Sequence, residues 1–175
     1  MSIWDIDPSH STVGFTVRHL VIAKVHGRFG KFSGVVELEE GDLLRSKINV
    51  SIDVDSIDTR EPQRDAHLKS PDFFDAAKFP TMTFASRSIE RAGEGYRMTG
   101  DLSIHGVTRP VTLEVEDGGR VKDPWGNDRA AFSAKGRIDR KDFGLTWNQV
   151  LEAGGLTVGD RVDIDLEVEA VRRKS

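Results

Sequence analysis

The stretch Val162-Asp163-Ile164-Asp165-Leu166-Glu167-Val168-Glu169 decides the fold class of this 175-residue chain. Apolar and acidic residues alternate in it without a break, and a period of two is typical of a strand with one buried and one solvated face. The same alternation, clear or weaker, recurs often enough to predict about eight strands. It is found at 13–17, 28–39, 48–55, 81–90, 95–105, 111–116 and 129–139.

The connections between these segments indicate that the sheet is antiparallel. Most of them are short and contain glycine together with aspartate, glutamate or asparagine, as tight turns do. Parallel strands would instead be continuous apolar runs with helices between them. An antiparallel sheet of about eight strands tends to close into a barrel or to split into a sandwich.

One connection, 58–80, is long enough to hold helices. We expect Thr59 to cap a short helix with Pro62 in its first turn, and Ser70 to cap a second one. Pro80 should end helical structure at the residue before it. The predicted fold class is thus all-β with a short helical insertion, in one domain that spans residues 1–175.

Composition and charge exclude several function classes. The chain has 25 basic and 29 acidic residues, a net charge of −4, and no cysteine. A disulfide framework, a thiolate metal site and a cysteine nucleophile are therefore excluded. No basic stripe marks a nucleic-acid binder, and no apolar run approaches the ~18 residues of a membrane span. The first residues lack a secretory signal, which predicts a cytoplasmic protein.

The polar motifs predict no catalytic residue, no metal site and no cofactor. The five histidines do not have the spacing of metal ligands. The segment Ser9-His10-Ser11 is not part of a Gly-x-Ser-x-Gly nucleophile elbow, and no glycine-rich phosphate loop opens a helix. The insertion gathers four polar residues, which form either a solvated helical face or the polar rim of a barrel: Arg60, Arg64, Asp65 and His67.

Two of the predicted inward-facing rows contain glycine where a filled barrel would place a bulky side chain. Gly100 lies between Met98 and Leu102, and Gly136 follows Ala134 in its row. These glycines either let coiled strands bend or leave space for a ligand. A cavity at this place would have an almost wholly apolar lining, so its ligand would be apolar.

Several segments together resemble the YceI-like family. They are Trp4-Asp5-Ile6-Asp7-Pro8-Ser9-His10-Ser11, Phe15-Thr16-Val17-Arg18-His19-Leu20, the segment 64–75 followed by Phe79-Pro80 and Phe84, the segment 100–109, the segment 140–147, and Val158-Gly159-Asp160. The similarity runs in order along nearly the whole chain. It implies an eight-stranded antiparallel, lipocalin-like barrel with an elongated apolar tunnel.

The resemblance also implies a function. Family members are associated with the binding of isoprenoid quinones or prenyl chains, and some with other long-chain lipids or amides. We therefore expect a non-enzymatic carrier or buffer of a long-chain isoprenoid-like lipid, with no cofactor, no nucleic-acid partner and no stable membrane insertion.

The residues expected to contact the ligand come from the inward rows and from the family's motifs. They are Phe15, Val17, His19, His67, Phe73, Phe74, Phe79, Met98, Phe132, Ala134, Phe143 and Trp147. Seven polar residues match signature positions of the family and either touch a head group or tie loops together: His19, Asp65, His67, His105, Arg109, Arg140 and Asp142.

Two other classes of function stay open. An enzyme that acts on a lipid head group would need an acid and a base at the barrel mouth, and Asp65 and His67 are the first candidates for that pair. A barrel filled with side chains would instead be an interaction module with an exposed apolar patch. Association into a homodimer also stays open.

Overall fold

A computed structural model describes residues 1–20, 22–149 and 156–175 of the chain. It contains eleven strands in one antiparallel sheet, one α-helix and four short 3-10 turns. The strands are β1 (Ser2–Ile6), β2 (Thr12–His19), β3 (Ala23–Phe29), β4 (Phe32–Leu38), β5 (Lys47–Asp53), β6 (Ile57–Asp58), β7 (Thr81–Ala92), β8 (Gly95–Ile104), β9 (Val107–Lys122), β10 (Asp128–Asp139) and β11 (Val158–Arg172), and the helix is α1 (Pro62–Lys69).

The eleven strands form a closed barrel of eight rows, as predicted. The turn Pro8–His10 divides one row into β1 and β2, and both parts pair with β11. A short break after Phe29 divides the next row into β3 and β4, which pair with β2 and β1. The turn Val54–Ser56 divides a third row into β5 and β6. The remaining rows are β7 to β11 in sequence order, and β11 closes the ring against β1 and β2.

The alternating residues face the directions that the sequence predicts. Val162 and Ile164 on β11 point into the barrel and line its cavity. Asp163, between them, points outward and forms ion pairs with Arg161 and Arg137 at 2.9 and 3.4 Å. The strand therefore buries its apolar face and solvates its acidic one.

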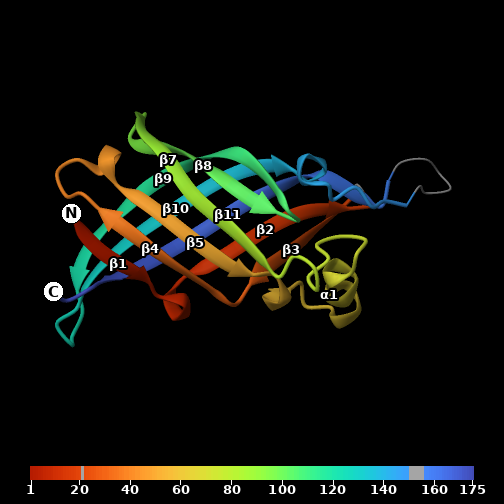
Figure 1. Ribbon diagram of the computed structural model, residues 1–175, viewed down its shortest axis with the longest axis horizontal. Coiled ribbons are helices and arrows are strands. Elements are labelled where there is room, and N and C mark those ends of the chain that lie inside the picture. The colour runs from red at the N-terminus through yellow and green to blue at the C-terminus, as the bar shows by residue number, and fades with distance from the viewer. Residues whose placement is uncertain (21, 150–155) are drawn as a thin grey trace.

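The two ends of the barrel carry different connections (Figure 1). The helix α1, the β2–β3 hairpin and the connection from β10 to β11 lie at one end, which we call the insertion end. Both chain termini lie at the other, the terminal end, together with the β9–β10 turn. No helix in the described part of the chain is long and apolar enough to cross a membrane.

The insertion contains one helix, so the expectation of two was wrong. Its N-cap is Glu61, whose side chain accepts a hydrogen bond from the Arg64 backbone N–H, and Thr59 does not cap it. Ser70 ends α1 and is followed by turns. Asp75 has a positive φ of 50°, which a right-handed helix does not allow, so no second helix forms.

The two glycines of the inward rows do not leave empty space. A Cβ atom at Gly100 would overlap the ring of Phe84 and would lie 2.7 Å from the Ala85 carbonyl oxygen. A Cβ atom at Gly136 would overlap the side chain of Leu113. Bulky residues of neighbouring strands thus fill the space over both glycines, and the cavity is formed elsewhere.

Candidate ligand-binding cavity

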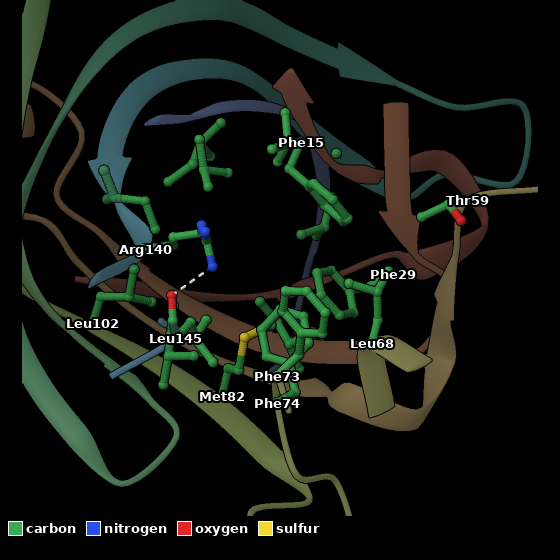
Figure 2. A pocket seen from close by; sticks show the side chains of 18 of the residues that line it. Phe15, Phe29, Thr59, Leu68, Phe73, Phe74, Met82, Leu102, Arg140 and Leu145 are labelled. Atoms are coloured by element: carbon green, nitrogen blue, oxygen red, sulfur yellow. Dashed lines mark hydrogen bonds between the residues drawn. The ribbon is translucent and has the colours of Figure 1, made fainter. Parts of the chain in front are cut away.

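A cavity of about 570 Å³ extends from the insertion end into the barrel. Its volume lies within the ~300–1,000 Å³ that is usual for small-molecule sites. Figure 2 shows aromatic and aliphatic side chains around the space, with Arg140 pointing into it. The apolar wall includes Ile6, Val13, Phe29, Phe32, Ile48, Val50, Ile52, Leu68, Met82, Phe84, Leu102, Ile104, Val111, Leu113, Ile138, Leu145, Val158, Val162, Ile164, Leu166 and Val168.

The cavity opens to solvent at the insertion end. Arg18 and Gln63 line it and are exposed, whereas its walls farther in are apolar. We call this opening the mouth. The polar residues that line it are Arg18, His19, Thr59, Glu61, Gln63, Arg64, His67, Arg140 and Thr157.

Most of the residues predicted to contact a ligand line this cavity. The structure brings together Phe15, Val17, His19, His67, Phe73, Phe74, Met98 and Trp147. They come from β2, β8, the insertion and the connection that follows β10, which are far apart in the sequence.

Two predicted residues, Phe132 and Ala134, line a separate small cavity of about 100 Å³ towards the terminal end. Four side chains line both cavities and therefore lie between them: Ile48, Met98, Leu166 and Val168. Neither Phe132 nor Ala134 lines the main cavity.

Phe79 and Phe143 lie outside the lining that the described residues form. Phe79 covers the β8–β9 turn, where its ring centroid is 4.8 Å from that of His105 and Gly106 makes room for it. Phe143 is 1% exposed and belongs to the core beneath the connection after β10. Their aromatic character indicates burial and does not indicate which space they face, so their contact with a ligand stays a prediction.

An aromatic cluster stands at the mouth. The His67 ring lies 4.7 Å from that of Trp147 and 5.1 Å from that of Phe73, edge to face in both cases. Its Nε2 atom lies 2.9 Å from a carboxylate oxygen of Asp72. The helix α1 and the connection after β10 are thereby joined across the mouth.

The segment before α1 is held by its own polar groups. The Asp65 carboxylate accepts hydrogen bonds from the backbone N–H and the hydroxyl of Thr59, at 2.9 and 2.6 Å. Arg64 donates to the same hydroxyl and to the Thr59 carbonyl oxygen. Thr59 is buried, so these bonds satisfy polar groups that water cannot reach. Asp65 is therefore occupied in bracing the loop.

Arg140 supports the opposite side of the mouth. It is 3% exposed and donates to the carbonyl oxygens of Gly159, Leu145 and Trp147 at 2.8–3.0 Å. Burial lowers its pKa, and the nearby Asp160 carboxylate opposes this effect. Its Nη2 atom is 3.5 Å from Asp160 Oδ1, and neither atom has a hydrogen-bond partner among the described residues.

Arg109, like Asp65, is a signature residue with a structural role. Arg109 donates through Nε to the Asp142 carbonyl oxygen at 3.2 Å, which ties β9 to the turn after β10. The signature positions thus divide: Arg109 and Asp65 hold loops, whereas His19, His67 and Arg140 also line the cavity.

Arg18 and Thr157 were not among the predicted site residues. Strict alternation along β2 places Val17 and His19 inward and Arg18 outward. Arg18 lines the mouth because it lies near the end of its strand. In the sequence, the one indication that Arg18 could reach the mouth was its position as a charged residue close to the end of a predicted strand.

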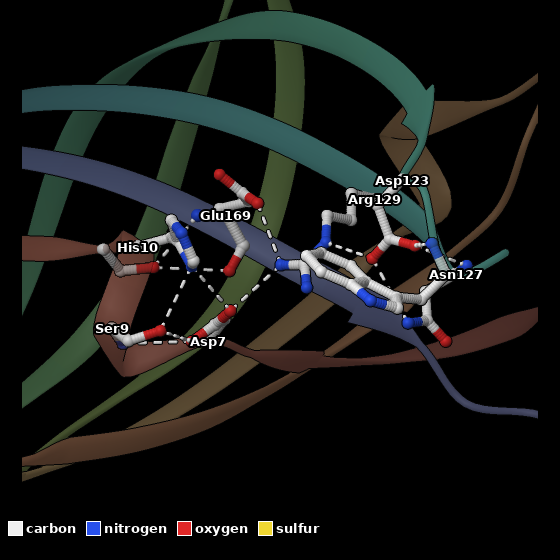
Figure 3. A network of polar contacts seen from close by, with 9 residues as sticks. Asp7, Ser9, His10, Asp123, Asn127, Arg129 and Glu169 are labelled. Carbon is white, nitrogen blue, oxygen red and sulfur yellow. Dashed lines mark hydrogen bonds and ion pairs between the residues drawn. The ribbon is translucent and has the colours of Figure 1, made fainter.

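An ion-pair network at the terminal end resembles a metal site. Oxygen or nitrogen atoms of Asp7, His10 and Glu169 lie close enough to hold an ion. The guanidinium of Arg129 takes that place, because its Nη1 atom is 2.9 Å from a carboxylate oxygen of both Asp7 and Glu169 (Figure 3). Its Nε atom donates to Asp123 at 2.8 Å.

This network keeps two aspartates charged. Hydrogen bonds from Ser9 and Arg129 hold the pKa of Asp7 well below its usual range. Hydrogen bonds from Arg129 and Asn127 do the same for the pKa of Asp123. The network joins the start of the turn Pro8–His10, between β1 and β2, to the β9–β10 turn and to β11.

Comparison with known proteins identifies the family of the chain. The profile of the YceI-like domain matches residues 4–170. The chain belongs to the YceI-like family. A YceI protein of Escherichia coli is 39% identical over 170 residues, which are 97% of this chain and 86% of that protein.

Solved structures share the YceI-like fold. BcnA of Burkholderia cenocepacia superposes with a TM-score of 0.82 at 25% identity, over 94% of this chain and 98% of that one. A polyisoprenoid binding domain from Saccharophagus degradans, implicated in plant cell wall breakdown, superposes with a TM-score of 0.66 over 99% of this chain and 100% of that one. At 16% identity, the second similarity is evidence for the fold alone.

Proposed function

We propose that this protein binds a long-chain isoprenoid-like lipid, a prenyl chain or an isoprenoid quinone, and carries or buffers it without chemical change. The observation that carries the proposal is the cavity of about 570 Å³, which is apolar along the barrel and polar only at its mouth. Each methylene group buried in such a cavity contributes about 0.8 kcal/mol. A long apolar chain is thus bound mainly by burial. That the fold also serves as a polyisoprenoid binding domain in Saccharophagus degradans agrees with this proposal.

The mouth favours a ligand with an electron-rich head group. Three arginines line the cavity, Arg18, Arg64 and Arg140, against one carboxylate, that of Glu61. Guanidinium groups donate hydrogen bonds to carbonyl and phosphate oxygens, and most strongly to anionic ones. We therefore propose that the head group stays at the mouth while the chain enters the barrel.

The two alternatives have less support. The proposed acid and base of an enzyme, Asp65 and His67, have different partners, since Asp65 bonds to Thr59 and His67 to Asp72. A filled barrel would not contain a cavity of this volume.

A chain-length series tests the proposal. A fluorescent prenyl probe is displaced by prenyl alcohols of increasing length, and we expect affinity to rise steeply with length until the chain fills the cavity. Val50→Asp, which places a carboxylate in the cavity wall, should abolish binding. Ser51→Asp, one residue along β5 and outside the cavity lining, is the matched control and should bind normally.

Two results decide the proposal. Affinity that does not depend on chain length, or probe binding that survives Val50→Asp in a folded protein, would show that the cavity is not the site. Stronger displacement by a prenyl pyrophosphate than by the alcohol of equal length would support the role of the arginines.

A further inference from the structure

The β2–β3 hairpin has a charge pattern that the rest of the chain does not share. Between Ser9 and Val36 the sequence contains four arginines and lysines and no aspartate or glutamate, although the whole chain has a net charge of −4. The four cations are Arg18, Lys24, Arg28 and Lys31.

The cations nearest the hairpin tip are not neutralised. Among the residues that the structure describes, no carboxylate lies within ion-pair distance of Arg18 or Lys24. Arg28 lies 3.7 Å from Asp58, in a loose and exposed pair. On the neighbouring strand β11, the acidic residues Asp163, Asp165 and Glu167 lie opposite residues 12–16, away from the tip. Asp160 lies nearer the tip, but its carboxylate pairs with Arg140 and Lys141 at 3.5 and 3.1 Å.

Two described residues at the tip of the hairpin are apolar and exposed. Ile22 is 86% exposed, and Leu20 is exposed as well. The Leu20 backbone N–H donates to the Thr157 carbonyl oxygen at 2.8 Å, which brings the exposed Leu156 beside the hairpin. Exposed apolar side chains of this size, gathered at one place, mark an interaction surface.

This surface borders the mouth of the cavity. Val17, Arg18 and Val25 of the hairpin line the cavity, and so does Thr157. Figure 1 shows the hairpin reaching past the body of the barrel at the insertion end. Whatever binds the tip therefore faces the opening through which a ligand passes.

We propose that the β2–β3 hairpin docks on an anionic lipid bilayer. Leu20, Ile22 and Leu156 enter the interfacial region, and Arg18 and Lys24 lie against lipid phosphates. Apolar residues flanked only by cations are the combination that binds peripheral proteins to such surfaces. Docking in this orientation places the mouth over the bilayer, which is the source of a long-chain lipid; this last step rests on the proposed function.

Vesicle sedimentation tests the docking. Phosphatidylcholine vesicles with and without one third phosphatidylglycerol are mixed with the full chain at low and at physiological ionic strength. We expect binding to the anionic vesicles only, weakened by salt. Lys24→Gln should lower the affinity about fivefold, and Ile22→Asp about tenfold or more.

Matched controls are available outside the hairpin. Val121 is 65% exposed and lies on β9, near the turn at the terminal end, so Val121→Asp should leave vesicle binding unchanged. Lys135 is exposed on β10, and Lys135→Gln should likewise have no effect. Equal losses from hairpin and control substitutions would overturn the proposal.

Probe binding in solution without vesicles separates this inference from the proposed function. Loss of vesicle binding by Ile22→Asp with unchanged probe binding supports docking by the hairpin. An unaltered protein that binds the probe but no vesicles, or neutral vesicles equally well, overturns docking and leaves the proposed function intact. A dimer in solution that Ile22→Asp dissociates, with no vesicle binding, would assign the surface to a second copy of the chain.

Discussion

The substitution Phe74→Ala tests whether Phe74 contacts the ligand at the mouth or belongs to the barrel core. Phe74 is half-buried, with its ring 6.1 Å from that of Phe29 on one side and the cavity on the other. A buried phenylalanine loses about 3–5 kcal/mol of stability on truncation to alanine. Since the cavity already borders Phe74, we expect about half of this loss, roughly 2 kcal/mol.

The same substitution should speed ligand release. A phenyl ring that covers two or three methylene groups of the bound chain contributes about 2 kcal/mol, which corresponds to roughly a ten- to thirtyfold change in affinity. Most of this change should appear in the off-rate. Stopped-flow transfer of a fluorescent prenyl probe to excess vesicles measures release, and urea denaturation measures stability.

Phe143→Ala is the matched control, because Phe143 is 1% exposed and outside the cavity lining. It should lose the full ~3–5 kcal/mol and leave release from the folded protein unchanged. If Phe74→Ala instead lost about as much stability as Phe143→Ala, with release unaltered, Phe74 would be a plug of the barrel core, and the entrance would have to lie elsewhere.

Three further predictions follow from the packing and the charges. Arg129→Gln removes a group that keeps Asp7 and Asp123 charged, so it should lower the free energy of unfolding, and this loss should be largest at neutral pH. This loss should shrink as the pH falls below the ordinary aspartate pKa of about 3.9. Urea denaturation of the two proteins at neutral pH and below that pKa checks this, and an equal loss of stability under both conditions would contradict it. Ala134→Leu fills part of the small cavity, so the melting temperature should rise or hold while the longest bound chain becomes shorter in a displacement series; unchanged chain selectivity would show that ligands do not reach this end. Gly100→Ala should lose about 1–3 kcal/mol in urea denaturation, since its Cβ overlaps Phe84, whereas Gly30→Ala meets no atom within 4 Å and should be close to neutral; equal effects would refute the packing argument.

The barrel could be predicted because its strands alternate strictly. At 162–169 each side chain is assigned to a face by its parity alone, and the structure confirms the assignment at Ile164 and Asp163. The breaks that divide three rows, such as the turn Pro8–His10, were not predicted. They depend on local turns within rows whose overall pairing continues on either side.

The glycines of the inward rows had two possible interpretations, and the structure does not support the one in which they leave space for a ligand. Gly100 and Gly136 left gaps in the inward rows, but Phe84 and Leu113 from adjacent strands fill those gaps. A one-dimensional pattern shows which way a residue points and does not show which cross-strand neighbour lies over it. The cavity lies inside the side chains of Phe84 and Leu113, which are part of its wall, and it opens at the insertion end between β2, the insertion and the connection after β10.

The polar part of the site was the hardest to predict. Alternation does not extend into the insertion, so nothing in the sequence pairs Asp65 with Thr59 or places His67 against Trp147. These contacts join segments that are distant along the chain or bent by turns. The cytoplasmic location stays a prediction.

The central claim is that the cavity holds a long apolar chain, and native mass spectrometry of protein purified without detergent tests it most directly. We expect a fraction of the protein to carry a bound mass that solvent extraction identifies as an isoprenoid-like lipid. That mass should be absent from Val50→Asp and present in Ser51→Asp. A protein that is free of any bound mass, and that gains none after incubation with prenyl alcohols or isoprenoid quinones, would contradict the account.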